Sequence, residues 1–341
     1  MRIRNPRWVH RDKTREPDLG ERRAVTVCIA TLFRWNYGTL ETPQHGIAAV
    51  VASDRKITYG DIEYEPPQLK LAFFPHAVIL IAGDFSLHSE ALRAVQKNVR
   101  QDSKPENIAL MYGQAIQAVK RRHAEDIYLA PIGLNTDTFL SQQKELSVEF
   151  VDRITSQLQK YEGDDVEALV VGSDGENAHV HTVDTRGKVG SADDIGFAAI
   201  GVGAWHAKSL FMQNGYSNVA IYAHALAITY AAKRAAEIAP GVGKTATDMY
   251  LITKDVIEPV RPDVMGKLPE LYETFYRKRQ EFAQEIVDGL AEFIARPAQK
   301  QESSDEGIGD PTKNSPPDGS ASSSTTEAPQ QNETGPKPTK T

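Results

Sequence analysis

Two residues early in the chain have the types and the spacing to do chemistry together. Asp54 ends the apolar run Val50-Val51-Ala52-Ser53, and Lys70 follows on a second strand-like segment, Leu69–Phe74. An Asp at the end of a buried strand and a Lys on a following strand can be held side by side inside a fold. Burial disfavours the charged lysine whereas a carboxylate partner favours it, and this competition tunes lysines for catalysis. The pair therefore predicts a catalytic site, with a purely structural salt bridge as the alternative.

Composition limits the kinds of protein that could carry this pair. The chain has 341 residues, of which 40% are hydrophobic and 25% charged, so we expect a globular core. A net charge of −7 argues against a nucleic-acid partner, and no apolar run reaches membrane-spanning length. The single cysteine, Cys28, excludes an intrachain disulfide and a cysteine metal cluster. We expect a cytoplasmic protein with no membrane partner, no secretory signal and no cofactor.

The chain divides into three zones by composition. Residues 1–24 are polar and basic, and they predict an N-terminal extension or a propeptide. Residues 25–295 carry all the strong hydrophobic periodicity and predict one folded domain. Residues 296–341 are rich in Ser, Thr, Pro, Gly, Gln and Glu, so burial cannot offset their ordering entropy and we expect a disordered tail.

Within the central zone, two blocks of strands alternate with pairs of helices. The expected strands are Val25–Leu32, Gly46–Ser53, Ile57–Tyr64, Leu69–Phe74, Ala77–Ala82, Glu167–Gly172, His179–Asp184, Ile195–Gly201 and Thr247–Thr253. The expected helices are Ser86–Arg100, Ile108–His123, Trp205–Gln213, Val219–Ile238 and about 269–294, with a helical insertion at about 129–162 that includes Val148–Lys160. We expect a long turn at Phe33–His45, because it contains Asn36-Tyr37-Gly38 and Thr42-Pro43. This order predicts an α+β fold with four αββα layers.

The same residues and their order resemble a known family. The segments that carry the resemblance are Val25–Ala30, Gly46–Arg55, Thr58-Tyr59-Gly60, Leu69-Lys70-Leu71, Ile81–Asp84 and Ala199–Ala204. Together they resemble the proteasome-type N-terminal-nucleophile hydrolases, which include proteasome α and β subunits and bacterial proteasome-like peptidases. The resemblance covers roughly residues 25–255, and the spacing from Asp54 to Lys70 equals that of the family.

The resemblance implies a reaction and assigns roles to residues. In active members of the family, a cut makes a Thr the first residue, its hydroxyl attacks an amide carbonyl, and its own amine acts as base. Carried over, Thr26 is the nucleophile, Lys70 lowers the pKa of the hydroxyl and Asp54 keeps Lys70 charged. The N–H of Gly83 would then stabilise the oxyanion.

Substrate and partners also follow from the resemblance. Thr58 and Gly60 would pair with a peptide or protein substrate as an added β-strand. Members of the family assemble through their helical layers, so the resemblance implies a homo-oligomeric ring. Because α subunits are not catalytic, a scaffold or ring component is the alternative to a threonine-type peptidase.

Three departures from the family pattern keep that alternative open. Val25 stands where the family has a Gly before the cut, and a β-branched residue resists the distortion that self-cleavage needs. Val202 replaces a Ser, and the turn Ala239–Thr245 lacks the usual Asp and Ser. A register that places Ala24 or Val25 at the nucleophile position predicts an inactive protein. Cleavage after Val27 would instead expose Cys28, although a free Cys is more often a buried apolar residue.

Two further patterns have simpler explanations. Gly241-Val242-Gly243-Lys244-Thr245 is similar to part of a phosphate-binding loop, but it lacks the first Gly of that motif and leads into a strand. His179 and His181 alternate on one face of a strand, yet no third ligand accompanies them. We therefore expect neither a nucleotide site nor a metal site.

Overall fold

The computed structural model describes residues 26–38, 43–59, 62–65, 70–161, 163 and 165–295. The chain divides into two units, and the boundary between Ala283 and Gln284 lies within the last helix. The first unit contains every strand that the structure describes. The second unit is represented by the end of that helix, whose Ile286, Leu290 and Ile294 side chains are exposed.

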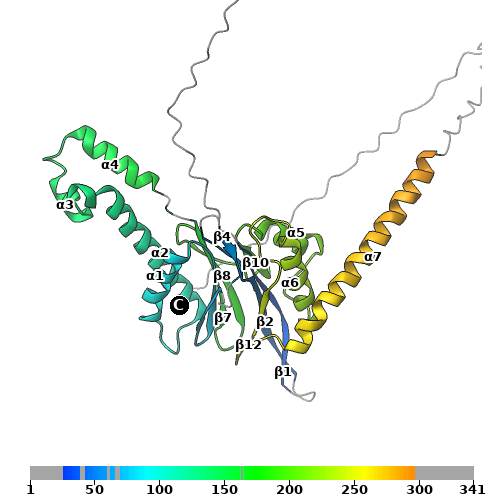
Figure 1. Cartoon of the computed structure of the whole chain (residues 1–341). Helices are drawn as coiled ribbons and strands as arrows, with labels where there is room; N and C mark the ends of the chain where they lie inside the picture. The colour runs from blue at the N-terminus through cyan, green and yellow to red at the C-terminus, as the bar shows by residue number, and fades with distance from the viewer. Residues whose placement is uncertain are drawn as a thin grey trace, which may run out of the picture. The chain divides into compact units, whose positions relative to one another are not determined.

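Two five-stranded antiparallel sheets form the centre of the first unit (Figure 1). The first sheet has the order β10-β1-β2-β11-β12, with bounds β10 Phe197–Ile200, β1 Cys28–Gly38, β2 Pro43–Asp54, β11 Thr247–Ile252 and β12 Ile257–Pro259. The second sheet has the order β5-β6-β7-β8-β9, with bounds β5 Leu71–Phe74, β6 Ala77–Gly83, β7 Val166–Ser173, β8 Ala178–Val183 and β9 Val189–Ser191. A short hairpin pairs β3 (Ile57–Tyr59) with β4 (Ile62–Tyr64).

Helices cover both sheets. Those of the described residues are α1 Phe85–Gln96, α2 Pro105–Tyr128, α3 Thr136–Gln142, α4 Val148–Lys160, α5 Ala204–Gln213, α6 Tyr222–Ala236 and α7 Pro262–Ala295, with a 3-10 turn at Ala130–Ile132. Helices α1 and α2 pack on the second sheet, and α5 and α6 pack on the first. Among these residues, no helix is long and apolar enough to cross a membrane. The mixed α+β class expected from the sequence is confirmed.

The strands nearest the centre are apolar on both faces because each face meets a different core. In β1, Ile29 and Phe33 pack with α5 and α6, whereas Cys28, Ala30 and Leu32 pack between the two sheets. The same alternation operates in β6 and β7, where one face meets the other sheet and the opposite face meets α1 and α2. Burial on both faces explains why these strands are continuous apolar runs in the sequence.

The long turn expected at Phe33–His45 is wrong. Strands β1 and β2 stay paired from Cys28–Ser53 to Gly38–Pro43, so they form one long hairpin. Phe33 packs in the core with Trp35 and Tyr222 against it, and these aromatic contacts keep the arm in strand geometry despite its Asn and Gly.

Other element boundaries also differ from expectation. The expected strand Ile57–Tyr64 is two strands, β3 and β4, paired from Ile57–Tyr64 to Tyr59–Ile62. Strands β9 and β12 were not expected, since each is short. Helix α7 begins at Pro262 rather than near 269, and Pro269 lies inside it. A proline at the first helical position has no N–H to lose, which makes Pro262 the better start.

Candidate active site

Three strands bring Thr26, Asp54 and Lys70 to one end of the two sheets. Thr26 lies two residues before β1, Asp54 ends β2, and Lys70 immediately precedes β5. The Asp54 N–H donates to the Val27 carbonyl at 3.3 Å, so the pairing of β1 with β2 continues beyond Cys28 and places Thr26 beside Asp54. On its other side, Asp54 lies opposite Thr247 of β11.

The Thr26 hydroxyl lies between a lysine and a carboxylate. Lys70 Nζ donates to Thr26 Oγ1 at 2.6 Å and to Asp54 Oδ1 at 3.1 Å, and Thr26 Oγ1 donates to Asp54 Oδ1. Thr26 is 2% exposed, Asp54 0% and Lys70 6%, so the cluster lies out of water. An ammonium that donates to a hydroxyl oxygen stabilises negative charge developing there, as a nucleophile requires.

Backbone donors fix the Asp54 carboxylate in one orientation. Its Oδ1 also accepts from Val27 N at 3.0 Å, while Oδ2 accepts from Gly243 N at 2.7 Å and from Lys56 N at 3.3 Å. A buried carboxylate is stable only when its oxygens are hydrogen-bonded, and these donors meet that requirement. Oδ1 is thereby directed at Thr26 and Lys70.

The loop that is similar to a phosphate-binding motif binds the protein's own carboxylates. While Gly243 N donates to Asp54, the N–H groups of Lys244, Thr245 and Ala246 donate to Glu65 at 3.1, 3.5 and 3.2 Å. Partial burial acts to raise the pKa of Glu65, but these donors and the Thr245 hydroxyl outweigh it, and the pKa is lowered. The backbone of this loop therefore ties the β3–β4 hairpin to the strand that ends in Asp54.

Gly83, the expected oxyanion donor, ends β6 in a backbone conformation that requires glycine. Its φ is +115°, and a Cβ there would lie 2.0 Å from the carbonyl oxygen of Asp165. The next residue, Asp84, caps α1 by accepting from Leu87 N at 2.8 Å. Lys70 O accepts from Ile81 N at 3.2 Å, which fixes β6 beside the residue that carries the ammonium.

The structure describes only one of the two expected substrate-binding residues. Thr58 lies in β3, paired with Glu63 of β4. Gly60 lies outside the described residues. Their roles stay predictions.

The tight turn at residues 201–203 packs against the backbone of Thr26. Gly203 N donates to the Thr26 carbonyl at 3.3 Å. Gly201 has φ +84°, and a Cβ there would lie 2.4 Å from the same carbonyl oxygen and 2.9 Å from Thr26 Cγ2. Only glycine allows this approach.

Glu167 joins this turn and was missed by the sequence analysis. Its Oε2 accepts from Gly201 N at 2.9 Å, and in β7 it lies opposite Ala82. One signal was available in the sequence, because Glu167 is in phase with Leu169 and Val171, which face the other sheet. A charged residue in that phase points to the interior between the sheets.

Cys28 does not fit the alternative role of nucleophile. Its thiol is buried and donates to the Ile81 carbonyl at 3.5 Å. Burial raises its pKa to about 12 despite the nearby Lys70, so the thiol stays protonated at neutral pH.

Ser53, opposite Cys28 in the β1–β2 pairing, was also missed. Its hydroxyl is the only buried side-chain polar atom of the described residues without a hydrogen-bond partner. An unpartnered hydroxyl beside a cluster of charges marks a place where water can bind.

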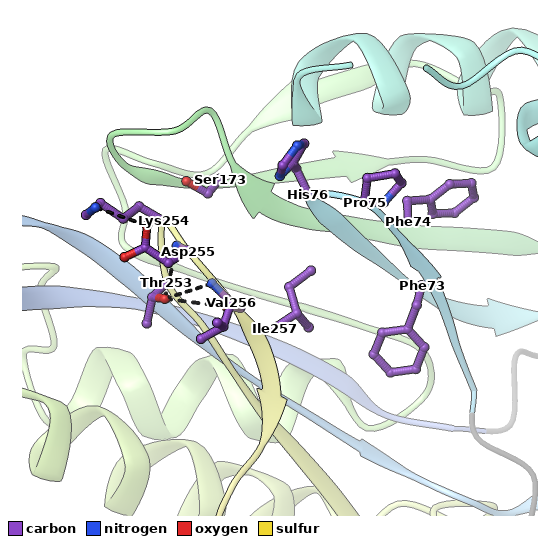
Figure 2. Close-up of a pocket in the computed structure, with 10 residues that line it drawn as sticks. All are labelled: Phe73, Phe74, Pro75, His76, Ser173, Thr253, Lys254, Asp255, Val256 and Ile257. Atoms are coloured by element: carbon purple, nitrogen blue, oxygen red, sulfur yellow. Dashed lines mark hydrogen bonds and ion pairs between the residues drawn. The ribbon is translucent and has the colours of Figure 1, made fainter. Parts of the chain in front are cut away.

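A pocket of about 240 Å³ lies at the opposite end of the strands (Figure 2). Its walls come from the β5–β6 turn, the end of β7 and the β11–β12 turn, and its lining residues are Phe73, Phe74, Pro75, His76, Ser173, Thr253, Lys254, Asp255, Val256 and Ile257. The register of β6 and β7 pairs Gly83 with Val166 at the Thr26 end and Ala77 with Gly172 at the pocket end. The open pocket and the buried charged cluster are therefore separate features.

Of the two histidines that alternate on β8, His179 binds neighbouring carboxylates. His179 Nδ1 lies 2.9 Å from Asp193 Oδ2, and His179 Nε2 lies 3.5 Å from Asp174 Oδ2. His181 stacks on His179 with ring centroids 6.3 Å apart. Within the described ranges, no group of three or more His, Cys, Asp or Glu side chains is arranged to hold a metal ion.

Comparison with known proteins finds similarity only among solved structures. No protein-family model and no curated protein match the chain. An Anbu (Gly-1) mutant from Hyphomicrobium sp. strain MC1 is 15% identical, with a TM-score of 0.49, covering 76% of this chain and 96% of that one. Anbu (ancestral beta-subunit) from Yersinia bercovieri is 15% identical, with a TM-score of 0.48, covering 81% of this chain and 100% of that one.

These comparisons correct the family expected from the sequence. The short motifs predicted kinship with proteasome α and β subunits and with bacterial proteasome-like peptidases. That assignment is wrong, because no family model matches and the two solved structures named above are Anbu proteins at 15% identity. Short motifs in the right order are compatible with more than one family, so the chemistry of the site has to be argued from its own contacts.

Proposed function

We propose that this protein hydrolyses peptide or other amide bonds with the Thr26 hydroxyl as nucleophile, after cleavage of the bond between Val25 and Thr26. The observation that carries the proposal is the 2.6 Å contact of Lys70 Nζ with Thr26 Oγ1, buried and backed by Asp54. A buried lysine donating to a hydroxyl is well suited to activate it.

The reaction uses each group of the cluster. The freed amine of Thr26 takes the hydroxyl proton as Oγ1 attacks the carbonyl carbon of the substrate. Lys70 stabilises the negative charge on Oγ1, and Asp54 holds Lys70 in place. The tetrahedral intermediate then expels the leaving amine, which takes the proton, and an ester remains on Thr26. Water hydrolyses the ester and returns the free hydroxyl.

Other expectations from the sequence complete the proposal. The Gly83 N–H would stabilise the oxyanion, and Thr58 with Gly60 would align an extended substrate. We propose one domain over 25–295 with αββα layering. Three apolar cores, one between the sheets and one between each sheet and its helices, support the layering. We also propose assembly into a homo-oligomer and a cytoplasmic location, which a single buried cysteine suits.

A catalytically inactive scaffold subunit is the second candidate, and one observation favours it. Asp54 accepts from Thr26, Lys70 and three backbone N–H groups, so the cluster is already satisfied without a substrate. A closed network of this kind can serve only to fix the strands to one another.

Hydrolysis by matched variants separates the two candidates. A panel of fluorogenic peptide amides is tested with the full-length protein, Thr26→Ala, Thr26→Ser and the control Thr31→Ala. Thr31 is likewise a buried threonine, but it lies within β1 and accepts from Thr229 at 2.7 Å instead of from a lysine. We expect Thr26→Ala to lose at least about a thousandfold in kcat, with Thr26→Ser and Thr31→Ala retaining activity. Equal rates for the wild type and Thr26→Ala would rule out the proposed nucleophile.

A further inference from the structure

Glu167 is a charged residue at an interior position of the second sheet. Its neighbours in phase, Leu169 and Val171, pack between the two sheets, whereas Val166 and Ala168 pack toward α1 and α2. Glu167 itself is half-buried at the end of β7 nearest Gly83. A carboxylate is rare in such a position unless a partner holds it there.

The partner of Glu167 is the turn that contacts Thr26. Glu167 Oε2 accepts from Gly201 N at 2.9 Å, and Gly201 approaches Thr26 so closely that a Cβ would meet its carbonyl and its methyl group. Within the described part of the chain, this is the only hydrogen bond that the Glu167 side chain makes, and it leaves Oε1 available. The charge of Glu167 is also felt next to Thr26, because it is among the groups that raise the pKa of Cys28.

The proposed chemistry needs a hydrogen-bond acceptor for the amine of Thr26. An amine that serves as base must be oriented, and a carboxylate is the strongest neutral-pH acceptor for an ammonium. Asp54 has both oxygens engaged by Thr26, Lys70 and backbone donors. Residues 201–203 contribute only backbone and a valine side chain to the turn around Thr26.

We propose that Glu167 is a positioning residue, whose free oxygen accepts a hydrogen bond from the amine of Thr26 once that amine has been released. The inference rests on the proposed function, since it requires cleavage before Thr26. Among the described residues, the other titratable groups beside Thr26 are Asp54 on β2, Lys70 before β5 and Cys28 on β1. Arg55 is engaged by Asp248 at 2.5 and 2.7 Å.

The pH dependence of activity provides a readout that a structural role would not change. A carboxylate close to an ammonium favours the protonated form, so Glu167 raises the pKa of the amine. Removing its charge lowers that pKa, and the amine is then free to act as base at lower pH. We expect Glu167→Gln to shift the acid limb of kcat/KM to lower pH by about one unit and to lower kcat about tenfold, because the amide orients the amine poorly.

The experiment uses full-length protein and a matched control. Glu167→Gln keeps an oxygen that can accept from Gly201 N, and Glu167→Asp keeps the charge on a shorter arm, so its acid limb should stay near that of the wild type. Glu176→Gln changes an exposed glutamate in the β7–β8 turn, at the opposite end of β7, and should change neither kcat nor the acid limb. Thermal unfolding of each variant shows whether it folds.

The outcomes separate this inference from the proposed function. A wild type that is cut and active, with an unshifted acid limb in Glu167→Gln, overturns the role of Glu167 alone. If Glu167→Gln does not fold, Glu167→Asp provides the test instead. A Glu167→Asp acid limb about one unit below that of the wild type, the shift expected for loss of the charge, would contradict the role. A wild type that stays uncut and hydrolyses no amide overturns both proposals.

Discussion

The two ends of the sheets differ in what they do with charge. At the Thr26 end, Lys70 and Asp54 pair at 3.1 Å with side-chain exposures of 8% and 0%. At the pocket end, Lys254 and Asp255 pair at 3.0 Å with exposures of 33% and 66%. The distances are nearly equal, but water screens only the second pair. The open pocket therefore carries the weaker electrostatics, and the buried pair lies at the end where we propose the catalytic site.

The comparison also shows why the pocket at the β5–β6 and β11–β12 turns is a weaker candidate for chemistry than the Thr26 end. The pocket at the β5–β6 and β11–β12 turns has polar atoms, but Thr253 and Lys254 already bond within their own turn (Figure 2). A reaction needs groups that are held out of water and aimed at one atom. In the described structure, the Thr26 hydroxyl is such an atom.

The largest effect is expected from removing the buried Lys70, and removing the exposed Lys254 is the comparison. Lys70→Met leaves Asp54 buried without its cation and should lower the free energy of unfolding by about 4 kcal/mol. Lys254→Met should lower it by less than about 1 kcal/mol, because its partner is solvated. Urea unfolding of both variants tests the contrast, and equal losses would mean that the two ends are not electrostatically different.

Glycines with positive φ provide the next contrast. Gly83→Ala should lower the free energy of unfolding by about 3 kcal/mol. The new Cβ would clash with the Asp165 carbonyl, and alanine is also strained at the positive φ of this position. Gly175, at the pocket end, has φ +100° with open space around it, so Gly175→Ala should cost about 1 kcal/mol. Thermal unfolding distinguishes these values, and a smaller loss in Gly83→Ala than in Gly175→Ala would contradict the tight packing at Gly83.

A smaller difference in stability is expected between variants of two buried serines. Ser173 Oγ accepts from Gly175 N at 3.1 Å, whereas Ser53 Oγ has no partner among the described residues. Ser173→Ala should lower the free energy of unfolding by about 1 kcal/mol, and Ser53→Ala should leave it unchanged or raise it slightly. Denaturant unfolding is the measurement. A loss in Ser53→Ala as large as in Ser173→Ala would show that Ser53 has a partner, such as a bound water.

The smallest expected effect is a pH dependence at the pocket end. Asp193, and more weakly Asp174, raise the pKa of His179 above 6.5 although partial burial opposes them. The extra stability is therefore fully present below the ordinary pKa and is lost as pH rises through the folded-state pKa. His179→Gln should cost about 0.5 kcal/mol more at about pH 5 than at about pH 9, after allowance for solvent exposure.

His181 supplies the control for that measurement. Its pKa is lowered, chiefly by burial, so protonation opposes folding and stability is lost as pH falls. His181→Gln should accordingly gain stability relative to the wild type at about pH 5. The same pH trend in both variants, measured by urea unfolding, would contradict the assigned roles of Asp193 and burial.

The sequence predicted those parts of the fold that depend on local pattern. Ala77–Ala82 and Val148–Lys160 correspond closely to β6 and α4, because a buried strand and an amphipathic helix each have a clear period. The hairpin arm Phe33–Gly38 was missed, since its strand geometry depends on packing of Phe33 and Trp35 of β1 against Tyr222. Tyr222 lies in α6, far away in the sequence.

The site was predictable only in part, for a similar reason. Asp54 and Lys70 could be paired from their strand context, and the structure brings Thr26 to both. The phase of Glu167 in β7 indicated an interior position, but its contact was not predictable, because it comes from β7 and the turn after β10 meeting around Thr26. Ser53 could not be assigned, because its significance comes from an unfilled hydrogen bond. The loop Gly243–Ala246 likewise shows its role only once Asp54 and Glu65 are seen to bind its backbone.

The most direct test of the account is the intact mass and N-terminal sequence of the purified full-length protein and of Thr26→Ala. Self-cleavage before Thr26 predicts a wild-type chain that begins at Thr26 and a Thr26→Ala chain that still begins at Met1 or Arg2. A wild-type preparation that hydrolyses amides while its N-terminus remains at Met1 or Arg2 would contradict it.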